Sequence, residues 1–298
     1  MKKLHTFSLA AALLLASPAL LASNFPLMPA AVHAAAQQDT IKESTLPAKA
    51  AGDKDEERSV EAPVPWLLVE DHRLEAYDAD GKCMVYSSRP IVRVKDSAHA
   101  SLACGLDAWN SQEAQDAKRG FNFAYDFKKE DRENGVPREA AYFDYSVITK
   151  WGRVDEHMVS FCSFGMSYAG GVHPMHGKGG ASFDTRTGKE VPLTAVVTSR
   201  EALLQALAAA FHAQYPGREE ELFAFDIREQ LERIHPAEKG LDTFSWYMGT
   251  RGELVFLYPP YALGPYSSGD FTLTIERADA PELFTETYPL NQPPHEAI

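Results

Sequence analysis

Two histidines and one aspartate stand close together in the stretch of this chain that could do chemistry. The segment 168–174 reads Tyr-Ala-Gly-Gly-Val-His-Pro, so Tyr168 and His173 flank a Gly-Gly break. His176 follows three residues after His173, and Asp184 follows eight residues after His176. Two imidazoles and one carboxylate form the donor set of a common class of metal site. The same three groups could also serve acid–base catalysis in a cell-wall hydrolase or esterase.

A complete catalytic or metal-binding pattern does not accompany these residues. Pro174 places His173 and His176 in a loop rather than on one face of a helix. No G-x-S-x-G nucleophile motif is present, and the sequence around Asp184 is typical of a turn. We therefore predict a protein without metal, cofactor or catalytic activity. A hydrolase that uses His173, His176 and Asp184 is the alternative.

Tyr261 and Tyr266 form a second group of candidate side chains. They lie among prolines in the segment 258–266, which reads Tyr-Pro-Pro-Tyr-Ala-Leu-Gly-Pro-Tyr. Tyrosine offers rigid contact area at a small entropic cost. The pattern indicates contact with a glycan or a protein partner, and packing of both rings against a sheet is the alternative.

The elements that must position these residues can be read from hydrophobic periodicity. Helical spacing predicts one helix over residues 98–129 and a pair of helices over residues 199–235. Short turns at Gly152 and Gly249 favour antiparallel neighbours. We expect an α+β fold, with a mostly antiparallel sheet, a helix in the first subdomain and a helix pair in the second. Alternating or β-rich runs predict strands near residues 66–69, 82–86, 91–94, 142–148, 158–168, 181–183, 243–248, 254–258 and 271–275.

The N-terminus has the pattern of an export signal. Lys2 and Lys3 precede an apolar run over residues 7–21, and Val32-His33-Ala34 offers the small-x-small pattern of a cleavage site. We predict a signal peptide over residues 1–34, with cleavage near Ala22 or retention as an anchor as alternatives. The mature protein would be periplasmic or extracellular and would not span a membrane.

The composition of the remaining chain indicates a spacer, two folded subdomains and a tail. Residues 35–61 lack aromatic side chains and are dense in charge, which predicts a disordered spacer. An N-terminal α+β subdomain is expected over residues 62–183 and a C-terminal subdomain over residues 184–277. A proline-rich tail, residues 278–298, follows.

Charge limits the class of partner. The chain carries −13, and loss of residues 1–34, which hold two lysines and no acid, would leave −13 − 2 = −15. Such a charge disfavours nucleic acid and anionic lipid and suits a cationic partner.

The cysteines leave two alternatives open. Cys83, Cys104 and Cys162 contain no C-x-x-C motif. Export would permit one disulfide with one thiol left over, whereas three reduced, buried thiols would act as small apolar side chains.

Three stretches together resemble a known family. The first is Tyr-Ala-Gly-Gly-Val-His at 168–173, and the second is Phe-Asp-Thr-Arg-Thr-Gly-Lys-Glu-Val-Pro-Leu at 183–193. After the predicted helix pair comes the third, with Leu254, Phe256, the run 261–266 and Gly269. In order and spacing they resemble the extracellular domain of unknown function shared by RsiV-type anti-sigma factors and PdaC-type peptidoglycan deacetylases, over roughly residues 63–277.

The resemblance implies an α+β fold with two subdomains and binding in the cell envelope. In RsiV-type proteins the domain binds lysozyme as a sensor, and in PdaC-type proteins it accompanies a separate catalytic domain. This chain shows no sigma-binding segment, internal transmembrane helix or paired-Asp metal motif, so we expect neither transmembrane sensing nor deacetylation. We expect a non-catalytic module that binds a cationic protein such as lysozyme, or a wall glycan, through Tyr168, His173, His176, Asp184, Tyr261 and Tyr266.

Overall fold

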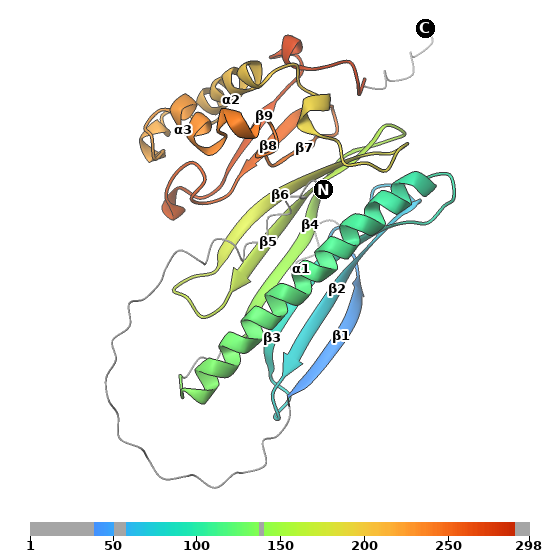
Figure 1. Cartoon of the computed structure of the whole chain (residues 1–298), viewed down its shortest axis with the longest axis vertical. Coiled ribbons are helices and arrows are strands. Elements are labelled where there is room, and N and C mark those ends of the chain that lie inside the picture. Colours follow the sequence, from blue (N-terminus) through green and yellow to red (C-terminus); the bar gives the residue numbers. More distant parts are fainter. Residues whose placement is uncertain (1–38, 51–57, 137–139, 290–298) are drawn as a thin grey trace.

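The fold is α+β, with a mixed six-stranded sheet and a long helix followed by a three-stranded antiparallel sheet with two helices (Figure 1). The structure is a computed structural model that describes residues 39–50, 58–136 and 140–289. This architecture confirms the predicted fold class. The predicted signal peptide, residues 1–34, lies outside the described residues and stays a prediction. Within the described ranges, no helix has an apolar stretch long enough to cross a bilayer.

The first sheet contains its six strands in chain order. Neighbouring strands are antiparallel, except that β3 and β4 run parallel over residues 85–88 and 142–145. The exception arises because a long helix, α1, connects these two strands, and a crossover of this kind returns the chain in the same direction. The strands are β1 (Thr40–Pro47), β2 (Leu67–Tyr77), β3 (Cys83–Val94), β4 (Tyr142–Val154), β5 (Met158–Tyr168) and β6 (Met175–Asp184).

Strand β1 corrects the prediction of a disordered spacer over residues 35–61. Residues 40–47 pair with β2 along their whole length, with Thr40 opposite Tyr77 and Pro47 opposite Glu70. The strand buries little of its own surface. It forms because β2 offers a row of backbone donors and acceptors, a partner that the local composition of β1 does not reveal.

Helix α1 (Ala100–Glu133) lies across one face of this sheet (Figure 1). Leu102, Leu106 and Trp109 are buried against it, as their spacing predicts. The Trp109 ring meets that of Phe161 in β5 edge to face, with centroids 5.3 Å apart. The odd-numbered residues of β5 therefore face α1, since successive side chains of a strand point to opposite faces.

The second unit packs on the opposite face of the sheet. Ser160 of β5 donates a hydrogen bond to the backbone oxygen of Met248, and Cys162 lies in a buried cluster with Tyr247. Helices α2 (Arg200–Gln214) and α3 (Ile227–Ile234) lie on the side of this unit away from the first sheet (Figure 1). Its sheet consists of β7 (Trp246–Met248), β8 (Leu254–Tyr258) and β9 (Phe271–Ile275).

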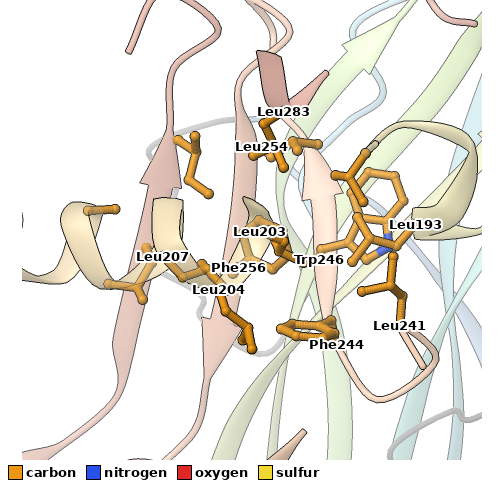
Figure 2. Close-up of a cluster of buried hydrophobic side chains, with 14 of the residues drawn as sticks. Leu193, Leu203, Leu204, Leu207, Leu241, Phe244, Trp246, Leu254, Phe256 and Leu283 are labelled. Carbon is orange, nitrogen blue, oxygen red and sulfur yellow. The ribbon is translucent and has the colours of Figure 1, made fainter. Parts of the chain in front are cut away.

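A leucine-rich face of α2 fills the core of the second unit. Leu203, Leu204 and Leu207 are fully buried, and Figure 2 shows them gathered beside Phe256 and Trp246 of the sheet. Burial of each such side chain contributes about 1.5–3 kcal/mol. This core makes the second unit a rigid support for its loops.

The predicted helix pair is present, but its second helix is shorter than predicted. Residues 219–221 form one 3-10 turn, and α3 begins only at Ile227 because Asp226 caps it by accepting from the Glu229 amide at 2.7 Å. Phe223, four residues before Ile227, lies outside the helix and is exposed.

The C-terminal stretch up to residue 289 is packed and is not a free tail. Leu283, Phe284 and Tyr288 are buried, and Thr198 donates its amide to the Leu283 oxygen at 2.8 Å. The Arg153 guanidinium of β4 donates to the Tyr288 oxygen at 3.2 Å. The described part of the predicted tail, up to residue 289, is thus ordered, because these apolar side chains complete the core of the second unit.

Cys83, Cys104 and Cys162, all of them among the described residues, form no disulfide. Cys162 is buried, Cys83 is half-buried and Cys104 is exposed on α1. The alternative of one disulfide is therefore wrong, and the alternative of three buried thiols is right for Cys162 and wrong for Cys104.

Candidate functional site

His173, His176 and Tyr266 meet where the first sheet contacts the second unit. The His173 ring stacks on the Tyr266 ring with centroids 4.0 Å apart, and the His176 ring lies edge-on to Tyr266 at 5.6 Å. The Tyr266 hydroxyl donates to the Pro174 oxygen at 3.0 Å and lies 3.3 Å from Nδ1 of His176. Two sequence segments about 90 residues apart are thus joined through one tyrosine.

His176 lies in strand β6, which corrects the prediction that Pro174 places it in a loop. His176 pairs with Met166 and Gly180 pairs with Cys162 in the β5–β6 ladder. Gly180 allows close packing of the two units. A Cβ atom on Gly180 would lie 2.2 Å from the backbone oxygen of Trp246 in β7, so only glycine lets the two units approach here.

Two charged residues that sequence reasoning missed complete the cluster. Lys178 forms an ion pair with Asp270, and Nε2 of His176 lies 3.9 Å from the same carboxylate. Lys178 follows His176 by two residues, so both side chains lie on the same face of β6. If this segment had been predicted as a strand, the alternation of its side chains would have placed Lys178 beside His176. Asp270 is distant in sequence and carries no local signal.

Tyr261 extends the cluster into solvent. Its ring is 5.7 Å from that of Tyr266, and the residue is 50% exposed. The Ala262 amide donates to the Pro259 oxygen at 3.0 Å, which closes a turn with Tyr261 in its third position at a φ of 70°. That position normally takes glycine or asparagine. An exposed aromatic residue in strained backbone is an indication of function.

Phe223 and Phe225 lie on the neighbouring loop and were also missed. The Phe223 amide donates to the Leu263 oxygen at 3.0 Å, so the loop 222–226 runs beside the loop 259–266. Phe225 is 72% exposed and has a φ of 55°. We call the exposed or partly exposed group formed by both loops and His173 the aromatic surface: His173, Phe223, Phe225, Tyr261 and Tyr266.

Acidic side chains surround this aromatic surface. Residues 218–232 contain two arginines and six acids, a balance of 2 − 6 = −4. Both arginines are engaged, since Arg218 pairs with Glu221 at 2.6 Å and Arg228 pairs with Glu201 at 2.6 Å. Glu220 and Glu229 are exposed. The local field is therefore negative.

Asp184 does not join the two histidines. It ends β6, eight residues after His176, a separation of about 26 Å along a strand. Its carboxylate accepts hydrogen bonds from the amides of Arg186 at 3.0 Å and Thr187 at 2.9 Å. The three-residue site drawn for a hydrolase is thus not assembled. In the part of the chain that the structure describes, no three His, Cys, Asp or Glu side chains are grouped so as to hold a metal ion.

The environment of Asp184 is that of a structural turn. Burial by itself raises its pKa, but hydrogen bonds from the Arg186 side chain, the Thr187 amide and the Tyr288 hydroxyl outweigh burial and lower the pKa to about 2. The carboxylate is a fixed anion that holds the turn after β6.

Tyr168 lies away from the aromatic surface. It ends β5, and its ring contacts Tyr142 at 5.7 Å and Phe143 at 5.9 Å. It packs against the small core beneath the C-terminal half of α1. The ring is thus engaged in packing against β4 at the end of β5.

Comparison with known proteins identifies one domain. Residues 196–278 match a family model described as a protein of unknown function, DUF3298. A member of the DUF3298 family from Bacteroides fragilis NCTC 9343 is 14% identical, with 84% of this chain and 94% of that chain covered and a TM-score of 0.48. A DUF3298 family protein from Pseudomonas aeruginosa PAO1 is 13% identical, with 84% and 95% covered and a TM-score of 0.42.

A comparison with curated proteins gives no match. The family model confirms, for residues 196–278, the resemblance that the sequence indicates over roughly residues 63–277. Residues 196–278 of this chain form a DUF3298 domain, the domain shared by RsiV and PdaC.

Proposed function

We propose that this protein is an exported, non-catalytic module that binds a cationic protein of the cell envelope through its aromatic surface. The observation that carries the proposal is the geometry of Tyr261 and Phe225. Both are large, exposed aromatic residues with positive φ, a conformation that costs on the order of 1–3 kcal/mol. Burial of the rings does not offset that cost in the free protein, whereas contact with a partner would.

The nature of the partner follows from charge. The aromatic surface lies beside a segment with a balance of −4. A basic protein such as lysozyme would be attracted by this field, and its Lys or Arg side chains could rest on the faces of exposed rings. A neutral wall glycan could also stack on tyrosine, but it would gain nothing from the acidic neighbours.

The hydrolase alternative receives less support from this arrangement. Asp184 holds a turn about 26 Å along β6 from His176. The carboxylate that does approach His176, Asp270, is occupied by Lys178. A histidine needs an oriented partner and an adjacent nucleophile to act in hydrolysis, and this cluster offers contact chemistry instead.

The test is binding of purified exported protein to lysozyme at low salt, followed by calorimetry and by surface-based kinetics. We expect a complex. Substitution Tyr261→Ala should leave the association rate within about twofold and raise the dissociation rate at least about tenfold, since contact residues act mainly on dissociation.

Ile41→Ser is the matched control, because Ile41 is an exposed apolar residue on β1, outside the aromatic surface. It should leave both rates unchanged. Absence of heat and of a complex would contradict the choice of lysozyme, and binding of soluble wall glycan in a parallel titration would show that the partner is a sugar. Equal effects of Tyr261→Ala and Ile41→Ser would remove the aromatic surface from the proposal.

A further inference from the structure

A second group of exposed aromatic side chains lies on α1, away from the aromatic surface. Phe123 is 38% exposed and Phe127 is 43% exposed, and their ring centroids are 4.7 Å apart. Residues four apart are neighbours on one side of a helix. The pair is too exposed to serve the core, and adjacent apolar rings of this kind are typical of a protein–protein contact.

The position of Phe127 on the helix explains its exposure. It follows Trp109 by 18 residues, which is about five turns, so both lie on the same side of α1. At Trp109 that side meets the rings of Phe161 and Phe183. Farther along, most residues of β5 and β6 that share the face of Phe161 are small, with Met175 as the larger exception. The small residues leave Phe127 uncovered: Ser163, Gly165, Ser167, Gly177 and Gly179.

Charged residues flank the phenylalanine pair on the same side of the helix. Arg119 precedes Phe123 by four residues, and Glu130 follows Phe127 by three. Measured from the midpoint of the pair, Arg119 lies about 9 Å toward one end and Glu130 about 7.5 Å toward the other. The Arg119 side chain contacts Asp116 and is still 57% exposed. These four residues form a stripe along α1. It has a positive end at Arg119, an apolar centre at Phe123 and Phe127, and a negative end at Glu130.

We propose that this stripe binds a second copy of the chain, with the two α1 helices packed antiparallel across Phe123 and Phe127. A two-fold axis through the midpoint places each Phe123 against Phe127 of the partner subunit. The same axis brings Arg119 to Glu130 of the partner subunit, twice in the dimer. A surface that complements itself in this way is what a two-fold interface requires.

The charge of this region also suits association of like copies. Residues 116–133 contain five basic and five acidic side chains, a balance of zero, in a chain that carries −13. Two copies can meet here without the repulsion that they would feel elsewhere. Because α1 and the second unit lie on opposite faces of the sheet, the dimer leaves the aromatic surface open.

The test is sedimentation velocity of the protein purified from cells that export it, over a wide range of concentration. We expect a reversible dimer. Phe127→Glu should abolish it, and Ile41→Ser should leave it unchanged. Glu130→Arg should raise the dimer Kd about tenfold, as the loss of both symmetry-related surface pairs predicts, and adding Arg119→Glu should bring it back to within about threefold.

Crosslinking adds a measurement that does not depend on affinity. Asp126→Cys lies near the two-fold axis, and Cys104→Ser removes the exposed native thiol. A short bismaleimide crosslinker, which spans the roughly 8–10 Å between packed helices, should link two copies of this double variant and should fail once Phe127→Glu is added. Thermal melts verify that each variant folds. A monomer at every concentration, a dimer indifferent to Phe127→Glu, or no rescue by the charge exchange would each overturn the proposal.

Discussion

The carboxylate of Asp184 accepts hydrogen bonds from Arg186, Thr187 and Tyr288, and the last of these comes from the C-terminal stretch. The residue therefore connects the turn after β6 to the core of the second unit. A carboxylate near histidines in sequence is easily assigned to chemistry. Its hydrogen bonds show that its role is to hold backbone.

Replacing this carboxylate should change how stability depends on pH. The pKa of Asp184 is about 2 in the fold, below its ordinary 3.8, so the stabilisation is complete above about 3.8 and is lost as the pH falls toward about 2. At pH 7 we expect Asp184→Asn to lower the free energy of unfolding by about 2 kcal/mol. Urea unfolding at pH 7 and near pH 2.5 measures the difference.

Asp80→Asn is the control for this experiment, because Asp80 lies in an exposed turn. It should cost under about 0.5 kcal/mol at either pH. An equal loss for Asp184→Asn at both pH values would show that its charge is not what stabilises the turn.

At the scale of elements, hydrophobic spacing predicts a helix or strand correctly where that element has an apolar face of its own. The stripes of α1 and α2 and the alternation of β5 meet this condition. Strand β1 does not, since its partner is the edge of β2. The stretch 279–289 likewise depends on a core that is built elsewhere. The local sequence of β1 does not reveal that it pairs with β2, and the local sequence of 279–289 does not reveal that it packs on the core of the second unit.

Gly105 tests whether packing overrides local preference in α1. Inside a helix, alanine is more favourable than glycine by about 1 kcal/mol. A Cβ atom at this position, however, would lie 1.7 Å from the backbone oxygen of Gly188. We expect Gly105→Ala to lower the free energy of unfolding by about 1–3 kcal/mol because the helix and the turn must separate.

Thermal or urea unfolding measures this change, with Cys104→Ala as the control. Cys104 is the exposed neighbour on the same helix, so its replacement should be close to neutral. Stabilisation by Gly105→Ala would mean that helix propensity dominates and that the contact with Gly188 is loose.

At the scale of the whole molecule, the candidate site is produced by the packing of two units. Sequence singles out His173, His176, Tyr261 and Tyr266 as candidates, because their residue types are distinctive. It could not show that Tyr266 joins them across the junction. It also placed Asp184 in the wrong group, because closeness in sequence along a strand is not closeness in space.

The net charge of the molecule leads to a prediction on kinetics. The mature chain would carry −13 − 2 = −15, and lysozyme is strongly basic, so attraction should speed their encounter. Salt shortens the reach of this attraction to about 10 Å at 0.1 M and about 3 Å at 1 M. We expect the association rate to fall steeply as salt rises, while the dissociation rate, set by buried aromatic contacts, changes little.

Stopped-flow mixing at several salt concentrations measures the first rate, and displacement by unlabelled protein measures the second. The double variant Glu220→Gln and Glu229→Gln removes exposed charge beside the aromatic surface, so it should slow association and flatten its dependence on salt. The variant Glu43→Gln, on β1, removes one charge far from that surface and should do neither. An association rate that is independent of salt, or equally affected by both sets of variants, would show that the acidic segment does not guide the partner to this surface.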